Sequence, residues 1–558
     1  MRWFAASILF CCSCATVQGG NLAEAGGAGL HSIRAEALSA RIRFLSDDLL
    51  EGRFTGSRGH AIAERYVASE LAALGLEPAG EGGSFRQPVP LRSAQRDLSS
   101  GALTFSGRGG DEPLKPDEEF ILQSDLRTGS VDVSGPMVFA GYAVVAPEYH
   151  YDDLAGLDLK GKIAVIFSGA PLSEREDFFP SVAHAVLGDT RAKIRRLAAL
   201  GAVGLITVFR PEDENRLPWA RVITGSRLPQ MAWLKPDGEP GSAPGGVPLR
   251  GTIHWKAFEK LLERGGIPGG LAALEAKAKA NTLKPFDMNG TLHGKLTTAF
   301  TPITSGNVVG ILRGSDPKLR DEYVIYTAHL DHLGIGAPID GDALYNGALD
   351  NASGVASVLE VARAFAAQPQ RPSRSILFVF VTGEERGLLG SDYYAHNPTV
   401  PVSSMVANIN IDMLVPQRHL YDVNSLGLDH STLGEHVRAA AAALQITVSG
   451  DPNPKQMSFI RSDQYSFVKL GIPAMYIGPG DKDASGSTEA GLLLRKKWIA
   501  TRYHSPKDKW DPAYDYEAMA QVVRADFLTG LSVANAADRP RWNKGDFFAR
   551  FPEKAEDR

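Results

Sequence analysis

Three apolar segments in the second half of the chain each end beside a residue that can bind a metal ion or accept a proton. The segments YVIYTA, SILFVFVT and VANINI are followed by His329, by the pair Glu384 and Glu385, and by Asp412. Continuous apolar runs of this length are typical of strands that are buried on both faces of a sheet. In an open parallel sheet, ligands gather at the carboxyl ends of the strands. The sequence therefore predicts that these side chains lie together at one edge of a sheet.

Helical patterns alternate with these strands from Thr297 onward, for example in SGVASVLEVARAFAA and DYEAMAQVVRADFLTGL. Such alternation predicts an α/β fold with a mainly parallel, mixed sheet sandwiched by helices. We assign residues 291–535 to this domain and residues 536–558 to a C-terminal tail. Residues 31–128 begin with two amphipathic helical patterns and form the N-terminal part of the same domain.

The middle of the chain, residues 129–290, has a different pattern. Short β-rich runs such as SVDVSGPMVFAGYAVV and KGKIAVI precede a helix that leads into a strand, AKIRRLAALGAVGLITV. We interpret this region as a separate, β-rich insert. The AKIRRLAALGAVGLITV run resembles the protease-associated domain, an inserted module of some exopeptidases, and an unrelated α/β insertion is the alternative.

The first residues predict export. Residues 1–19 contain Arg2, a short apolar run and then small residues, as in a signal peptide, and the run is too short to span a bilayer. We therefore expect a periplasmic or secreted protein without a membrane span. All three cysteines lie here, and Cys14 is a candidate for a lipid anchor. The Gly- and Ala-rich residues 20–29 predict a flexible tether.

The charge balance argues against one class of partner. The chain has 59 Lys and Arg against 64 Asp and Glu, a net charge of −5, and no basic block. This gives no support for binding to nucleic acid.

The candidate metal ligands are imidazoles and carboxylates, a mixed nitrogen and oxygen set that suits zinc. They are His329, Asp350, Glu385, Asp412 and His504. Five ligands that include one shared carboxylate are the inventory of a hydrolase with two metal ions a few Å apart. The sequence thus predicts two Zn²⁺ ions as cofactors.

These residues stand in motifs that resemble the co-catalytic di-zinc aminopeptidase family. The motifs are His329-Leu-Asp331, Asp350-Asn-Ala-Ser-Gly, Glu384-Glu385, Asp412 and His504. The family includes bacterial leucyl aminopeptidases, and glutamate carboxypeptidase and the transferrin receptor are relatives. The resemblance covers residues 31–95 and 297–535, with the insert between them.

The resemblance implies a role for each residue. Asp350 would bridge both ions, His329 and Asp412 would complete one site, and Glu385 and His504 would complete the other. Glu384 would be the general base. Asp331 would accept the second imidazole N–H of His329 and fix the orientation of the ring. The family also has a cis peptide after the bridging aspartate, here Asp350–Asn351.

One segment departs from the family pattern. FIRSDQYSF resembles a family segment that usually reads Ser-Asp-His, but Gln464 replaces the histidine. Asp463 and Tyr465 are candidates for substrate binding, with packing or helix capping as the alternative. We expect His332 to be a loop residue or to support a ligand rather than to be one.

The function that this pattern predicts is a secreted, zinc-dependent aminopeptidase that removes N-terminal residues from peptides. A carboxypeptidase with the same chemistry is the alternative, and it would need arginines near the metals to bind a terminal carboxylate. Arg418, Arg461 and Arg502 are close to site segments in the sequence. A non-catalytic binding protein like the receptor relatives should have lost ligands, and none is lost here.

Overall fold

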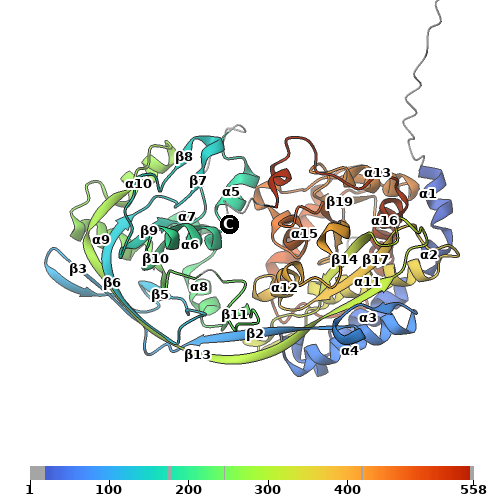
Figure 1. Ribbon diagram of the computed structural model, residues 1–558, viewed down its shortest axis with the longest axis horizontal. Helices are drawn as coiled ribbons and strands as arrows, with labels where there is room; N and C mark the ends of the chain where they lie inside the picture. The colour runs from blue at the N-terminus through green and yellow to red at the C-terminus, as the bar shows by residue number, and fades with distance from the viewer. Residues whose placement is uncertain (1–18, 172–177, 244, 416–418, 553–558) are drawn as a thin grey trace, which may run out of the picture.

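The computed structural model describes residues 19–171, 178–243, 245–415 and 419–552. Two lobes lie side by side in Figure 1. The larger lobe contains the N-terminal helices and the second half of the chain, and the smaller lobe contains the middle of the chain. The long strands β2 (Arg86–Arg96) and β13 (Phe286–Leu312) run along the base of the molecule from one lobe to the other.

The sheet of the larger lobe is mixed and has a parallel centre. Strand β14 pairs in parallel with β17 and with β18, and β18 pairs in parallel with β21. Strand β13 is antiparallel to β17 at one side, and β19 is antiparallel to β21 at the other. The bounds are β14 Tyr323–His329, β17 Ser375–Val381, β18 Met405–Asn410, β19 Asp422–Leu426 and β21 Ala474–Pro479. All residues of β14, β17 and β18 are buried, as their apolar sequences predict.

Helices cover both faces of this sheet. On one face α11 (Ser353–Ala366) and α16 (Tyr516–Asn535) pack against the strands, and α3 (Ala35–Leu45) packs across both helices. On the other face α12 (Leu389–His396) and α14 (Gln464–Val468) contribute Tyr394 and Phe467 to the core. The predicted sheet sandwiched by helices is therefore confirmed.

The glycine-rich residues after the leader form helices and not a tether. Helices α1 (Gly19–Ala25) and α2 (Gly27–Ser32) pack against the larger lobe. A Cβ atom added at Gly29 would lie 2.4 Å from Cζ of Phe527, so the glycine permits close helix contact. The prediction of a tether was wrong because this contact involves residues almost 500 positions away. Cys14 and all of the predicted leader except Gly19 lie outside the described residues.

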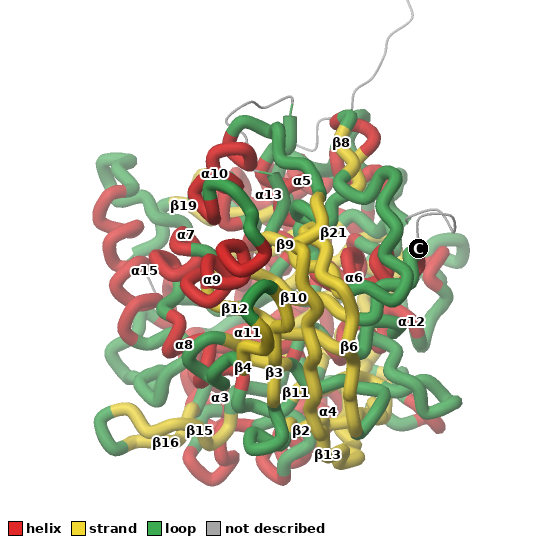
Figure 2. The backbone as a smooth tube through the Cα atoms, turned by 90° about the vertical axis from the view of Figure 1, so that its left-hand side faces the viewer, coloured by secondary structure: helices red, strands yellow, loops and turns green. Residues whose placement is uncertain are grey.

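The smaller lobe has its own sheet, seen from its outer side in Figure 2. The strands of this sheet lie in the order β12–β10–β9–β6–β13–β3–β4, and β5 pairs antiparallel with β12. The bounds are β3 Ala102–Gly107, β4 Gly110–Pro113, β5 Phe120–Leu122, β6 Ser130–Phe139, β9 Ile163–Phe167, β10 Gly204–Phe209 and β12 Leu249–His254. Because β3 to β5 belong to this sheet, the lobe begins before residue 129. Strands β3, β4 and β5 have only 6, 4 and 3 residues, which is too short for a clear alternation in the sequence. The resemblance to the protease-associated domain stays a prediction.

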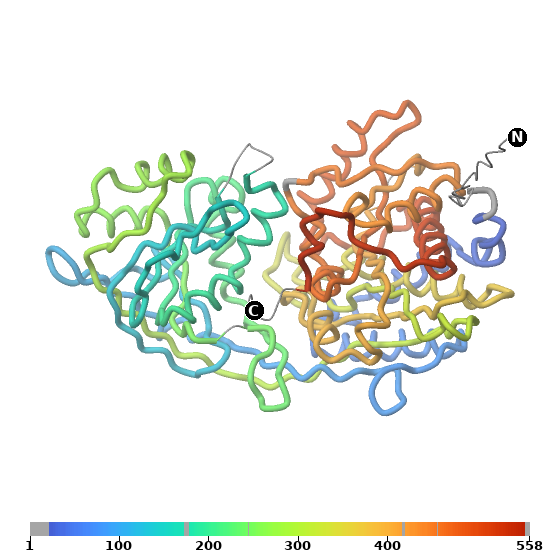
Figure 3. Tube along the Cα trace, turned by 45° about the horizontal axis from the view of Figure 1, so that its top comes forward, coloured from blue at the N-terminus to red at the C-terminus, as the bar shows by residue number. Residues whose placement is uncertain are grey.

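The described part of the C-terminal tail, residues 536–552, crosses the larger lobe and ends at the junction with the smaller lobe, as the dark red trace in Figure 3 shows. Phe548 and Phe551 are buried in a cluster with Val186, which belongs to α5 (Ser181–Leu187) of the smaller lobe. Arg550 pairs with Glu148 of the same lobe at 2.7 Å. Within the described ranges, no helix has the length and apolarity needed to cross a bilayer.

Candidate metal centre

The five predicted ligands come together at the carboxyl edge of the central sheet. His329 is the last residue of β14, Glu385 lies in the turn η5 (Glu384–Arg386) after β17, and Asp412 follows β18. Asp350 lies in η4 (Ala348–Ala352), which leads into α11. His504 lies in the loop after α15 (Glu489–Thr501).

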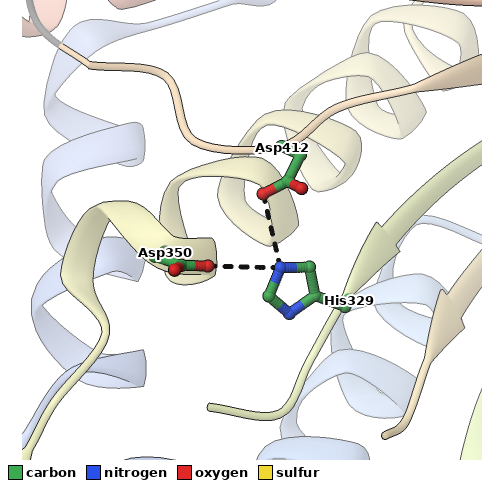
Figure 4. A group of neighbouring side chains, drawn as sticks. All are labelled: His329, Asp350 and Asp412. Atoms are coloured by element: carbon green, nitrogen blue, oxygen red, sulfur yellow. Dashed lines mark ion pairs between the residues drawn. The ribbon is translucent and has the colours of Figure 1, made fainter. Parts of the chain in front are cut away.

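Asp350 faces both histidines. Nε2 of His329 is 3.3 Å from Oδ1 of Asp350 and 3.3 Å from Oδ1 of Asp412, as Figure 4 shows. Nε2 of His504 is 3.2 Å from Oδ2 of Asp350 and 3.3 Å from Oε2 of Glu385. The residues therefore form two adjacent groups that share one carboxylate, as the resemblance implied.

These distances fit zinc. Nitrogen and oxygen ligands bind zinc at about 2.0–2.1 Å, so two ligand atoms on a tetrahedral ion are about 3.3 Å apart. The four distances from His329 and His504 agree with this separation. Oδ2 of Asp350 and Oδ1 of Asp412 are also buried without a hydrogen-bond partner among the described residues, and a cation would satisfy them. The donor set suits two Zn²⁺ ions.

The pKa shifts show that negative charge dominates the site. Burial would lower the pKa of His329, but the carboxylates of Asp412 and Glu384 raise it well above its usual value. Burial also opposes the charged form of His504, yet Glu385 and Asp350 raise its pKa to about 11. The surroundings of both imidazoles thus strongly favour positive charge. The same surroundings favour the binding of two cations.

Glu384 belongs to neither group of ligands. Burial raises the pKa of its carboxyl well above the usual range, and the nearby charges of Glu385 and Asp463 add to the shift against the opposing effect of His329. A carboxyl group with a raised pKa accepts a proton readily near neutral pH. The position of Glu384 therefore suits a general base.

Asp331 acts through different atoms from those predicted. Nδ1 of His329 donates to the backbone carbonyl of Asp331 at 3.1 Å, whereas the nearer carboxylate oxygen is 4.0 Å away. The carboxylate instead accepts hydrogen bonds from Oγ1 of Thr55 at 3.0 Å and from the backbone N–H of Glu384 at 3.1 Å. The predicted carboxylate–imidazole bond is thus corrected: Asp331 holds the ring with its carbonyl and the turn of Glu384 with its side chain.

The loop that carries Asp350 is held on two sides. The peptide bond between Asp350 and Asn351 is cis, as in the family pattern. The carboxylate of Asp508 accepts the backbone N–H groups of Leu349 at 2.9 Å and of Asp350 at 3.0 Å. Nδ2 of Asn351 donates to the carbonyl of Ile411 at 3.0 Å, which ties this loop to the strand end before Asp412.

The FIRSDQYSF segment lies beneath the site. Asp463 is fully buried, and burial raises its pKa to about 7. Tyr465 packs toward Phe551 and Lys469 in the cluster of the C-terminal tail. A role of Asp463 and Tyr465 in substrate binding stays a prediction, and these placements favour the packing alternative. Gln464 hydrogen-bonds Asn410 at 2.8 Å, so it is satisfied within the core.

Two further residues support the ligands and were missed in the sequence. Oγ of Ser462 donates to Oδ2 of Asp412 at 2.7 Å. Arg53 is buried and donates to the carbonyls of Leu330 at 3.0 Å and Gly347 at 2.9 Å. No local sequence pattern indicates either contact, because each contact joins segments that are far apart in the chain.

Of the three predicted arginines, the two that the structure describes make no hydrogen bond or ion pair with the metal ligands. Arg461 is exposed, and Arg502 donates to the hydroxyl of Tyr514 at 2.7 Å. Arg418 lies outside the described residues.

Comparison with known proteins agrees with this site. Residues 307–527 match the family model described as Peptidase family M28. A probable zinc metalloprotease of Pyricularia oryzae is 25% identical over 279 residues, which are 45% of this chain and 54% of that protein. Aminopeptidase YwaD of Bacillus subtilis is 30% identical over 220 residues, 38% of this chain and 41% of that protein. The chain thus spans about half the length of these curated relatives.

The fold also has a solved counterpart. An aminopeptidase from Aneurinibacillus sp. strain AM-1 superposes with a TM-score of 0.51 at 20% identity, covering 93% of this chain and 97% of that one. The likeness shows that the fold is shared across both lobes. The predicted family resemblance and the predicted zinc cofactors are confirmed.

Proposed function

We propose that this chain, whose residues 307–527 carry the catalytic region of an M28 peptidase, is a zinc-dependent aminopeptidase that removes N-terminal residues from peptides. The observation that carries the proposal is the pair of groups joined by Asp350, with Glu384 beside them but in neither group. All five ligand positions are filled, which supports catalysis over a purely binding role.

The chain's own residues account for the proton transfers. Two bound zinc ions supply Lewis acidity and lower the pKa of a coordinated water. Glu384 accepts a proton from the attacking water and returns it to the leaving amine. The bond from its backbone N–H to the carboxylate of Asp331 keeps the turn of Glu384 beside His329. Orientation of this kind contributes to rate because the reacting groups need no further ordering.

We also propose that the protein acts outside the cytoplasm. The leader-like sequence of residues 1–19 supports export to the periplasm or the medium.

The first test compares Glu384→Gln with the parent protein on peptides that have free or N-acetylated termini. We expect release of amino acids from the free-amine peptides alone, and a loss of about 10²–10⁴-fold in kcat for the variant with both zinc ions retained. Glu489→Gln, at an exposed site on α15, is the matched control. Removal of zinc by a chelator should abolish activity, and added zinc should restore it.

Two outcomes would contradict the proposal. Equal cleavage of acetylated peptides from the C-terminal end would identify a carboxypeptidase. Absence of cleavage of every peptide by protein that holds two zinc ions would exclude peptidase activity on these substrates.

A further inference from the structure

His332 is a buried histidine beside the second group of ligands. Its side chain is fully buried, and no other described residue hydrogen-bonds either ring nitrogen. Nδ1 of His332 lies 2.8 Å from Oε1 of Glu385 and 4.0 Å from Oδ2 of Asp350. The ring is therefore within reach of two predicted ligands, although the five-ligand pattern does not include it.

His332, Asp350 and Glu385 form a group that could hold a metal ion, but the distances from His332 favour a hydrogen-bond donor over a metal ligand. The atoms that face each other across the two ion positions are 3.2–3.3 Å apart, as expected for ligands of one tetrahedral zinc. The 2.8 Å and 4.0 Å distances from Nδ1 of His332 lie on either side of this value. A separation of 2.8 Å is instead typical of an N–H···O bond to a carboxylate. Oε1 of Glu385 and Nδ1 of His332 are both buried without a hydrogen-bond partner among the described residues although they lie 2.8 Å apart, so a bond between them would satisfy both atoms.

The backbone around His332 holds the ring in place. Its N–H donates to the carbonyl of Arg53 at 3.3 Å. The imidazole packs closely against Gly347, where an added Cβ atom would be 2.5 Å from Cγ of the ring. Gly347 has φ of 63°, so both its conformation and this contact favour glycine. The position of the ring is thus set before any ion binds.

We propose that His332 is a positioning residue that makes Glu385 a one-oxygen zinc ligand. His332 donates Nδ1–H to Oε1, and Oε2 of Glu385 is left to face His504 and the second ion. Without the donor, Glu385 is free to turn, and its oxygens are no longer held where the second ion would bind. The inference rests on the two-zinc site of the proposed function.

The test is a zinc titration of metal-free, full-length protein against a competing chelator, for the parent, His332→Phe and His332→Asn. Phe fills the cavity but has no donor, whereas the Asn amide can supply an N–H to Glu385. We expect His332→Phe to weaken the second zinc by about 10–100-fold and to leave the first zinc unchanged. His332→Asn should recover most of this affinity. His436→Phe, a half-buried histidine bonded to Ser532 on α16, is the matched control.

Cobalt spectra separate the donor from a ligand. With Co²⁺ in the second position, His332→Asn should keep the visible absorption of the parent, because no ligand atom is exchanged. A changed spectrum in both variants would make His332 a ligand and overturn the proposal. Unchanged zinc affinity in His332→Phe, or equal loss of both ions, would overturn it as well. Because binding is measured without a peptide, intact two-step binding in an inactive parent protein would reject the aminopeptidase and leave this inference standing.

Discussion

Arg53 links segments of the chain that carry two different metal ligands. Its guanidinium donates to the carbonyl of Leu330, next to His329, and to the carbonyls of Asn346 and Gly347, which precede Asp350. Burial lowers the pKa of Arg53 to about 10, and the carboxylates around it oppose the shift, so the side chain stays charged at neutral pH. One buried cation thus orders the backbone of both loops.

Substituting Arg53 tests this role. Arg53→Met leaves at least three buried carbonyls without a donor, and we expect a loss of about 3–5 kcal/mol in the free energy of unfolding. Urea unfolding of the metal-free protein measures the effect. Arg461→Met, at an exposed position, is the control. An unchanged unfolding midpoint would mean that water or other donors replace the guanidinium.

At the scale of elements, helix α6 (Thr190–Ala199) of the smaller lobe buries a lysine. Lys193 is 1% exposed, and its ammonium donates to the carbonyl of Gly169. Burial lowers the pKa of Lys193 to about 7, although the charges of Asp153 and Asp189 oppose the shift. Packing of this helix therefore buries an ionisable side chain, and burial disfavours the charged form of that side chain.

We expect the lowered pKa of Lys193 to make the free energy of unfolding depend on pH. In the unfolded chain its pKa is about 10.4, so between about pH 7 and pH 10 the unfolded state binds more protons and stability rises with pH. Relative to Lys193→Met, the parent should gain up to about 1.4 kcal/mol per pH unit in this window and nothing below it. Urea unfolding at pH 6, 7.5 and 9 measures the difference, with Lys160→Met at an exposed site as the control. A difference that is the same at all three pH values would show that Lys193 titrates normally in the folded state.

At the scale of the whole molecule, separate contacts connect the lobes near the site. The indole N–H of Trp233 donates to Asp392 on α12 at 2.7 Å. Arg191 of α6 donates to the carbonyl of Gly387 at 3.1 Å, just after Glu384 and Glu385. The C-terminal tail adds the aromatic cluster around Phe548. Because the Arg191 contact adjoins the turn that carries the proposed base, the smaller lobe reaches the edge of the site there.

Removing the aromatic ring of the tail should loosen this junction. Phe548 is fully buried between the lobes, so Phe548→Ala should cost about 3–5 kcal/mol. We expect a lower Tm and faster proteolysis between the lobes, with Phe44→Ala, at a partly exposed helix position, as the control. Identical proteolysis of the variant and the parent would show that the other contacts hold the lobes together without the tail.

The sequence by itself determined the central sheet and the gathering of ligands at its edge. Apolar runs such as SILFVFV specify buried strands, and the geometry of a parallel sheet brings the residues at the strand ends, His329, Glu385 and Asp412, to one edge. These features were predictable because they depend on local pattern and on the general geometry of sheets.

Only the tertiary structure decided which atoms support that site. The carbonyl rather than the carboxylate of Asp331 faces His329, and Arg53 reaches a carbonyl 293 residues away. The packing of α2 on Phe527 and of the tail on the smaller lobe also joins residues that are far apart in the sequence. Contacts of this kind arise when separate segments meet in the folded core. Each segment alone contains only one of the two interacting groups, so its sequence pattern does not identify the partner.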